Sequence, residues 1–163
     1  MRLNPNDKAP DMMVNSETRE RLLSAADKTF WTLVIFWKTT CSTCETSFPY
    51  LENLNAWYSD LVECVAVVQD VDARQGTEVA RRWGATFEVV ADAPPYPISF
   101  AYDQITTPTM FLVRNATRHV ETVLEACIKA DLNGLAAIIA ESGRQYAREI
   151  APSDDGHPAW TPG

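Results

Sequence analysis

Residues 33–49 read LVIFWKTTCSTCETSFP, and this stretch decides the fold that the sequence predicts. It begins with an apolar run without polar alternation, which is typical of a central strand buried on both faces. Cys41 and Cys44 follow this run directly, and a segment with helical spacing follows the cysteines. A strand that leads through a Cys-x-x-Cys pair into a helix is the layout of a thiol-disulfide redox site.

The helix expected after the dithiol is predicted by apolar residues that recur at intervals of three and four, namely Phe48, Leu51, Leu54 and Trp57. Pro49 lies inside this pattern. We expect it to kink the helix, because a proline removes one backbone hydrogen-bond donor.

The rest of the chain alternates between predicted strands and helices. We expect further strands at residues 62–72, 87–92, 110–113 and 119–124, and further helices at residues 16–26, 77–83 and 132–150. This order predicts an α/β fold with a central mixed β-sheet flanked by helices on both faces.

The length of 163 residues suits one domain. We expect that domain to cover residues 1–150. Residues 93–97 contain three prolines and predict a loop within it. Residues 151–163 are rich in Pro, Asp and Gly, and we expect them to form a disordered C-terminal tail.

Composition argues against two classes of partner. The net charge of −8, without a cluster of Lys and Arg, argues against nucleic acid. The longest apolar runs fall far below the ~18 residues that span a membrane. Residues 1–7 lack the apolar core of a signal peptide. As written, the chain is therefore expected in the cytoplasm, or in an extracytoplasmic space such as the periplasm if a leader has been removed.

The other cysteines and the histidines do not suggest a metal site or a cofactor. Cys64 and Cys127 stand alone in the sequence, and His119 and His157 are far from any Cys-x-x-Cys pair, so we expect no structural zinc. Cys64 lies in a predicted buried strand and reads as a packing residue. Core packing is also expected for Cys127. His119 reads as a surface or packing residue.

The spacing of the dithiol allows a reversible disulfide. Cysteines three apart on a first helical turn place their Cα atoms about 5 Å apart, within disulfide range. Backbone N–H groups and the helix dipole favour the thiolate of Cys41, which makes it the attacking nucleophile. Cys44 then resolves the mixed disulfide. The sequence leaves the direction of electron flow open.

Several motifs resemble the thioredoxin superfamily. Phe36-Trp37 before the cysteines and Pro49 after them fit thioredoxins in general. Four segments resemble the TlpA/ResA-like branch, which is related to the AhpC/TSA redoxins, more than they resemble thioredoxin itself. They lie at residues 9–11, 48–52, 83–87 and 107–113. The resemblance covers about residues 9–142. It implies a thioredoxin fold and a thiol-disulfide oxidoreductase without a cofactor, acting on protein or small-molecule disulfides or dithiols and supplied by an upstream electron donor.

The same resemblance assigns residues around the dithiol. It implies that Pro108 is the cis-proline that faces Cys41 and Cys44, and that the backbone of Thr107 pairs with an extended substrate. Trp37, Thr40 and Pro49 are implied as supporting residues. By the same resemblance, Ala126-Cys127-Ile128 falls close to the cis-proline and the dithiol, so a third thiol near the site stays open as the alternative to core packing.

The chain departs from its relatives at three positions. Ile35 stands where thioredoxin has a buried Asp, and Ser47 stands where ResA-like proteins have a Glu. The proton of Cys44 therefore lacks either family acid, and water or Glu45 remains as an acceptor. Thr40 replaces the Trp that is common before the first cysteine.

The sequence leaves three alternative functions. A peroxiredoxin-like peroxidase would carry Pro-x-x-x-Thr-x-x-Cys, but Lys38 holds the Thr position before Cys41. A non-enzymatic binding module switched by the redox state of the dithiol is a second alternative. Copper delivery is the third, and it lacks a third ligand at useful spacing.

Overall fold

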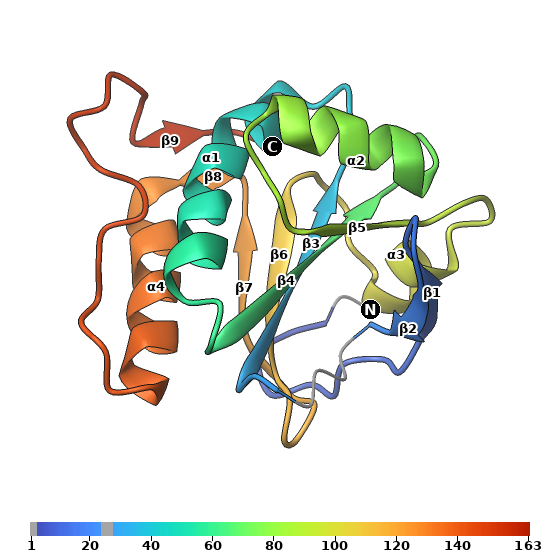
Figure 1. Ribbon diagram of the computed structural model, residues 1–163, viewed down its shortest axis with the longest axis horizontal. Coiled ribbons are helices and arrows are strands. Elements are labelled where there is room, and N and C mark those ends of the chain that lie inside the picture. Colours follow the sequence, from blue (N-terminus) through green and yellow to red (C-terminus); the bar gives the residue numbers. More distant parts are fainter. Residues whose placement is uncertain (1–2, 24–27) are drawn as a thin grey trace.

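A five-stranded mixed sheet forms the centre of the computed structural model, which describes residues 3–23 and 28–163 (Figure 1). The strand order is β5-β4-β3-β6-β7. The bounds are β3 (Trp31–Trp37), β4 (Val62–Val68), β5 (Glu88–Ala91), β6 (Thr109–Arg114) and β7 (Val120–Glu125). Strand β3 runs parallel to β4 and antiparallel to β6. Every residue of β3 is buried, which confirms the predicted central strand.

Three helices cover one face of the sheet, namely α1 (Ser42–Trp57), α2 (Ala73–Arg82) and α4 (Lys129–Ser142). The other face is covered by α3 (Pro97–Tyr102) together with N-terminal segments. Alternate residues of β3 serve the two halves of the core, because Ile35 packs with α1 and α4 while Phe36 packs with α3. The predicted mixed sheet with helices on both faces is confirmed.

An aromatic cluster fills the space between the end of β3 and α1. Trp37 lies with its ring centre 4.7 Å from that of Phe48 and 5.5 Å from that of Trp83. Phe87 completes the cluster, 5.2 Å from Phe48. Such tilted and edge-on pairs contribute about 0.5–1.5 kcal/mol each beyond the area they bury. The cluster therefore supports the strand end from which the dithiol emerges.

The predicted N-terminal helix is wrong in its described part. The structure has a β-hairpin there, with β1 (Met13–Asn15) paired to β2 (Glu20–Leu22). Ser16 closes the turn, because its hydroxyl oxygen accepts hydrogen bonds from the backbone N–H groups of Thr18 and Arg19. A serine can satisfy local N–H groups in this way as readily as at a helix start. Residues 24–26 of the predicted helix lie outside the described residues.

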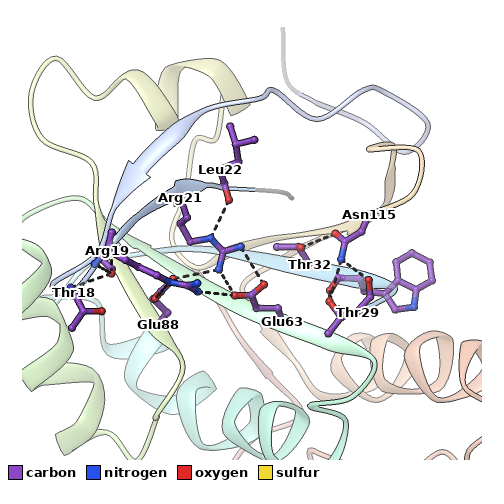
Figure 2. A network of polar contacts seen from close by, with 11 residues as sticks. Thr18, Arg19, Arg21, Leu22, Thr29, Thr32, Glu63, Glu88 and Asn115 are labelled. Atoms are coloured by element: carbon purple, nitrogen blue, oxygen red, sulfur yellow. Dashed lines mark hydrogen bonds and ion pairs between the residues drawn. The ribbon is translucent and has the colours of Figure 1, made fainter. Parts of the chain in front are cut away.

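Two arginines hold this hairpin against the sheet (Figure 2). Arg19 Nε donates to Glu88 Oε2 of β5 at 2.9 Å, and Arg21 forms a two-pronged pair with Glu63 of β4. The Arg21 side chain is only 9% exposed, so its partners are fixed. The hairpin thus depends on partners that are distant in the sequence.

Helix α3 and the ends of two other helices also differ from the predictions. The proline-rich segment leads into α3, where Pro97 occupies a first-turn position that tolerates proline. Helix α2 begins earlier than predicted, because Asp72 caps it together with Gln75. Helix α4 ends at Ser142 rather than near residue 150.

Residues 151–163, predicted to form a disordered tail, instead make defined contacts. Their strand β9 (Trp160–Thr161) pairs antiparallel with β8 (Cys127–Ile128). The nearly buried Lys129 donates from Nζ to Asp155 Oδ1 at 2.5 Å and to the carbonyl oxygens of Pro152 and His157. Asp155, one of the residues that suggested disorder, therefore has a buried partner. No helix among the described residues is long and apolar enough to cross a membrane.

Candidate functional site

The dithiol lies where β3 passes into α1, and it forms a disulfide. Cys41 is the N-cap of α1, and its Sγ accepts a hydrogen bond from the backbone N–H of Cys44 at 3.1 Å. The two Cα atoms are 5.2 Å apart, inside the range that a disulfide requires. Cys44 is fully buried, whereas Cys41 is partly exposed. A substrate sulfur can therefore reach Cys41 and not Cys44.

Thr107 and Pro108 form the wall that faces Cys41. The peptide bond between them is cis. Cys41 Sγ lies 3.5 Å from the carbonyl oxygen of Thr107. The loop is fixed on both sides, because Thr109 Oγ1 donates to the Thr106 carbonyl and the Ala126 N–H donates to the Pro108 carbonyl. The structure thus brings together the four residues predicted for catalysis and substrate binding.

The supporting residues surround the dithiol at different depths. Trp37 is fully buried at the end of β3, while Thr40 is exposed in the turn before Cys41. Pro49 lies inside α1, and the kink expected there stays a prediction. Asp70, which sequence reasoning missed, holds the turn by accepting hydrogen bonds from the backbone N–H and hydroxyl of Thr39. Its position just after β4 was the available signal, because parallel strands end at one edge.

Ser47 of α1 and Cys127 of β8 are buried next to one another, close to Cys44. Ser47 is fully buried and donates from Oγ to the Thr43 carbonyl at 2.7 Å. Its hydroxyl also interacts with the thiol of Cys127. Burial raises the pKa of Cys127, although Ser47 and the Lys129 ammonium act in the opposite direction. Cys127 belongs to the same core cluster as Cys44 and is 1% exposed.

Beside Cys127, a charged cluster joins α1, α4 and the C-terminal residues. Tyr50 and Lys129 both donate to the carboxylate of Asp155. These hydrogen bonds hold the pKa of Asp155 below its ordinary range, while burial and the carboxylate raise the pKa of Tyr50. Sequence reasoning missed this cluster, because its members are far apart along the chain and follow no local pattern.

On the other side of the dithiol turn, Lys38 and Asp70 line a cavity of about 290 Å³ together with Gln69, Tyr96 and Ser99. Two large apolar side chains are exposed close to these residues in the sequence, Phe100 on α3 and Ile105 in the loop before Thr107.

No group of three or more His, Cys, Asp or Glu side chains within residues 3–23 and 28–163 is arranged to hold a metal ion. Cys64 is buried in β4, where burial raises the pKa of its thiol.

Comparisons with known proteins agree with this geometry. The family model described as Redoxin matches residues 4–130. A structure described as a thiol:disulfide interchange protein DsbE, from Chlorobium tepidum, is 28% identical and superposes with a TM-score of 0.74. The match covers 86% of this chain and 98% of that chain. A search of curated proteins found no match.

Two further structures support the thioredoxin fold. The thioredoxin domain of a thiol-disulfide oxidoreductase from Bacteroides vulgatus is 20% identical, with a TM-score of 0.69, and the match covers 84% of this chain and 99% of that chain. StoA from Bacillus subtilis is 22% identical, with a TM-score of 0.58, and the match covers 72% of this chain and 89% of that chain. At these identities the likeness concerns the fold alone.

Proposed function

The chain belongs to the Redoxin family and is a thioredoxin-like thiol-disulfide oxidoreductase, and we propose that Cys41 is its nucleophile and Cys44 its resolving thiol. The observation that carries this assignment is the difference in burial between the two sulfurs of one disulfide. Cys44 is fully buried, and only the partly exposed Cys41 can meet a substrate sulfur. The backbone N–H of Cys44, which donates to Cys41 Sγ at 3.1 Å, also favours the Cys41 thiolate.

The reaction has two exchanges. The Cys41 thiolate attacks one sulfur of a substrate disulfide, so that a Cys41–substrate disulfide forms and the other substrate sulfur leaves as a thiolate that takes a proton from water. Cys44 then gives its proton to water or Glu45, and its thiolate attacks Cys41 Sγ. This step forms the Cys41–Cys44 disulfide and releases the second substrate sulfur as a thiolate that takes a proton from water. The substrate gains two electrons and the dithiol loses two. In the reverse direction the protein oxidises a substrate dithiol.

We assign Thr107 and Pro108 to substrate binding. The Thr107 carbonyl oxygen lies 3.5 Å from Cys41 Sγ, so a chain that pairs with this backbone is held beside the reacting sulfur. Pairing of an extended chain with an exposed backbone segment recognises main-chain groups and accepts many side chains. Protein disulfides are therefore a substrate class, and small disulfides reach Cys41 without this pairing.

The redox balance requires an electron donor, and the reduction potential bears on the compartment. Each turnover in the reducing direction leaves a disulfide, so an upstream dithiol donor is required to restore Cys41 and Cys44. The reduction potential of the couple against that of its compartment sets the direction. A reduction potential of about −270 mV would identify the protein as a reductant, which suits the cytoplasm. A reduction potential of about −120 mV would identify it as an oxidant, which suits an extracytoplasmic space. Fractionation of cells that express the native gene checks the compartment.

The test uses insulin reduction coupled to dithiothreitol. Cys41→Ser should abolish exchange, because the nucleophile is lost. Cys44→Ser should accumulate a mixed disulfide with the substrate, which mass spectrometry of the unreduced protein detects. Cys64→Ser is the matched control, since Cys64 lies in β4 and takes no part in the exchange. Full activity of Cys41→Ser contradicts the assignment.

A further inference from the structure

The last residues of the chain lie against the substrate-binding wall. The Pro162 carbonyl accepts a hydrogen bond from Thr43 Oγ1, and Thr43 lies between the two cysteines of the dithiol. A Cβ built on Gly163 would be 3.0 Å from the Thr107 carbonyl oxygen, which is itself 3.5 Å from Cys41 Sγ. Figure 1 shows β9 and the C-terminus near the start of α1. Residues 160–163, here called the C-terminal segment, therefore border the dithiol.

We propose that the C-terminal segment is a built-in occupant of the surface on which an extended substrate pairs with Thr107, and that it makes the protein discriminate between disulfides by size. This inference rests on the substrate-binding role proposed above. A protein substrate has to displace the segment before its backbone reaches Thr107. A small disulfide needs only the partly exposed Cys41 sulfur, so the segment does not hinder it.

Residues 152–159, which precede the C-terminal segment, are anchored by several contacts. The carbonyl of Ala159 accepts a hydrogen bond from the Lys129 N–H at 3.0 Å, and Lys129 Nζ holds Asp155 and two carbonyl groups. These contacts tether the segment next to the dithiol even when the segment itself has left. A short tether gives an effective concentration in the mM range, enough to compete with a substrate.

The segment itself is held through its backbone, by the pairing of β9 with β8 and by the hydrogen bond from Thr43, but its side chains add little. The Trp160 side chain is 59% exposed. Thr161 Oγ1 is buried and finds no hydrogen-bond partner among the residues that the structure describes. A buried hydroxyl without a partner weakens the docked state. A substrate chain that forms its own backbone hydrogen bonds can therefore replace the segment.

The experiment compares the full chain with a chain that ends at Ala159 and therefore keeps Asp155 and its partners. Insulin is the protein substrate, and hydroxyethyl disulfide is the small one. We expect the KM for insulin to fall at least about threefold on truncation, and about tenfold if the docked state is favoured by about 1.4 kcal/mol. The value of kcat for insulin and both constants for hydroxyethyl disulfide should stay within about twofold, because occupancy acts on binding alone.

Two further variants control this comparison. Asp154→Ala replaces an exposed side chain outside the segment, so it should behave as the full chain. The full-length triple variant Trp160→Gly, Thr161→Gly, Pro162→Gly weakens docking without shortening the chain, and it should shift the insulin KM as truncation does. Thermal unfolding shows whether the truncated chain folds. If it does not fold, the insulin KM of the triple variant tests the proposal in its place.

A synthetic peptide of residues 160–163, the residues that the truncated chain lacks, supplies the direct readout. Added to the truncated chain, it should inhibit insulin reduction competitively and leave hydroxyethyl disulfide reduction unchanged. Equal changes for both substrates, or no change in the insulin KM, overturn the inference. Failure of the proposed function looks different, since a full chain that reduces neither substrate, or one unaffected by Cys41→Ser, sinks the function itself.

Discussion

Replacement of Asp92 by Ala should release α3 from the sheet and destabilise the protein. Asp92 is 1% exposed and follows β5. Its two oxygens accept hydrogen bonds from the N–H of Ile98 at 3.0 Å, from the N–H of Ser99 at 2.7 Å and from the Ser99 hydroxyl at 2.6 Å. Gln69 extends the chain of contacts by donating to Ser99 Oγ at 2.7 Å. One carboxylate therefore organises the start of the helix.

The size of the effect follows from these contacts. A hydrogen bond to a charged group contributes about 1.5–3 kcal/mol, and a buried donor left unpaired costs about 1–3 kcal/mol. The Ile98 N–H is buried and the Ser99 groups are only partly so, which lets water replace some of what is lost. We therefore expect a loss of about 3 kcal/mol in the free energy of unfolding, or ~6–12 °C in Tm for a chain of this length.

Urea unfolding followed by tryptophan fluorescence measures the loss. Asp92→Asn is the matched control, because it keeps one acceptor oxygen and should lose roughly half as much. Asp154→Ala, an exposed acid, should stay within about 0.5 kcal/mol of the parent. The reasoning is refuted if Asp92→Ala costs less than about 1 kcal/mol, or if Asp92→Asn costs as much as Asp92→Ala.

Three further outcomes are expected. The pKa of Asp155 is lowered in the folded state, so its stabilising effect is present above its ordinary value of 3.8 and is lost as the pH falls below it; acid unfolding should therefore be less steep for Asp155→Asn than for the parent. Cys64 and Cys127 are buried with raised pKa values, so iodoacetamide at pH 7 should leave both unmodified in the reduced native protein, as mass spectrometry can check. Gly76→Ala should lower the urea midpoint, because the new Cβ would lie 2.9 Å from a Val89 methyl and overpacking of about 1–3 kcal/mol outweighs a helix-propensity gain of about 1 kcal/mol.

The redox site was predictable because its parts are local in sequence. The apolar run of β3, the dithiol and the apolar face of α1 follow one another, and each has a period or spacing that indicates its structure. The resemblance to known families supplied Thr107 and Pro108, which lie in the loop before β6, far from the dithiol along the chain, and carry no local sign of their place beside Cys41. Asp70 reaches the same turn from the end of β4, and it was missed.

By itself, then, the sequence determined the buried strand, the dithiol that follows it, and the order of the five sheet strands with α1, α2 and α4, since all of these depend on residues that are neighbours along the chain. Only the tertiary structure decided the N-terminal hairpin and the last thirteen residues, 151–163. Arg21 pairs with Glu63, which is 42 positions away in the sequence, and Lys129 pairs with Asp155, which is 26 positions away. A short polar segment has no intrinsic preference strong enough to order it, so its conformation depends on whether the rest of the fold presents a buried partner.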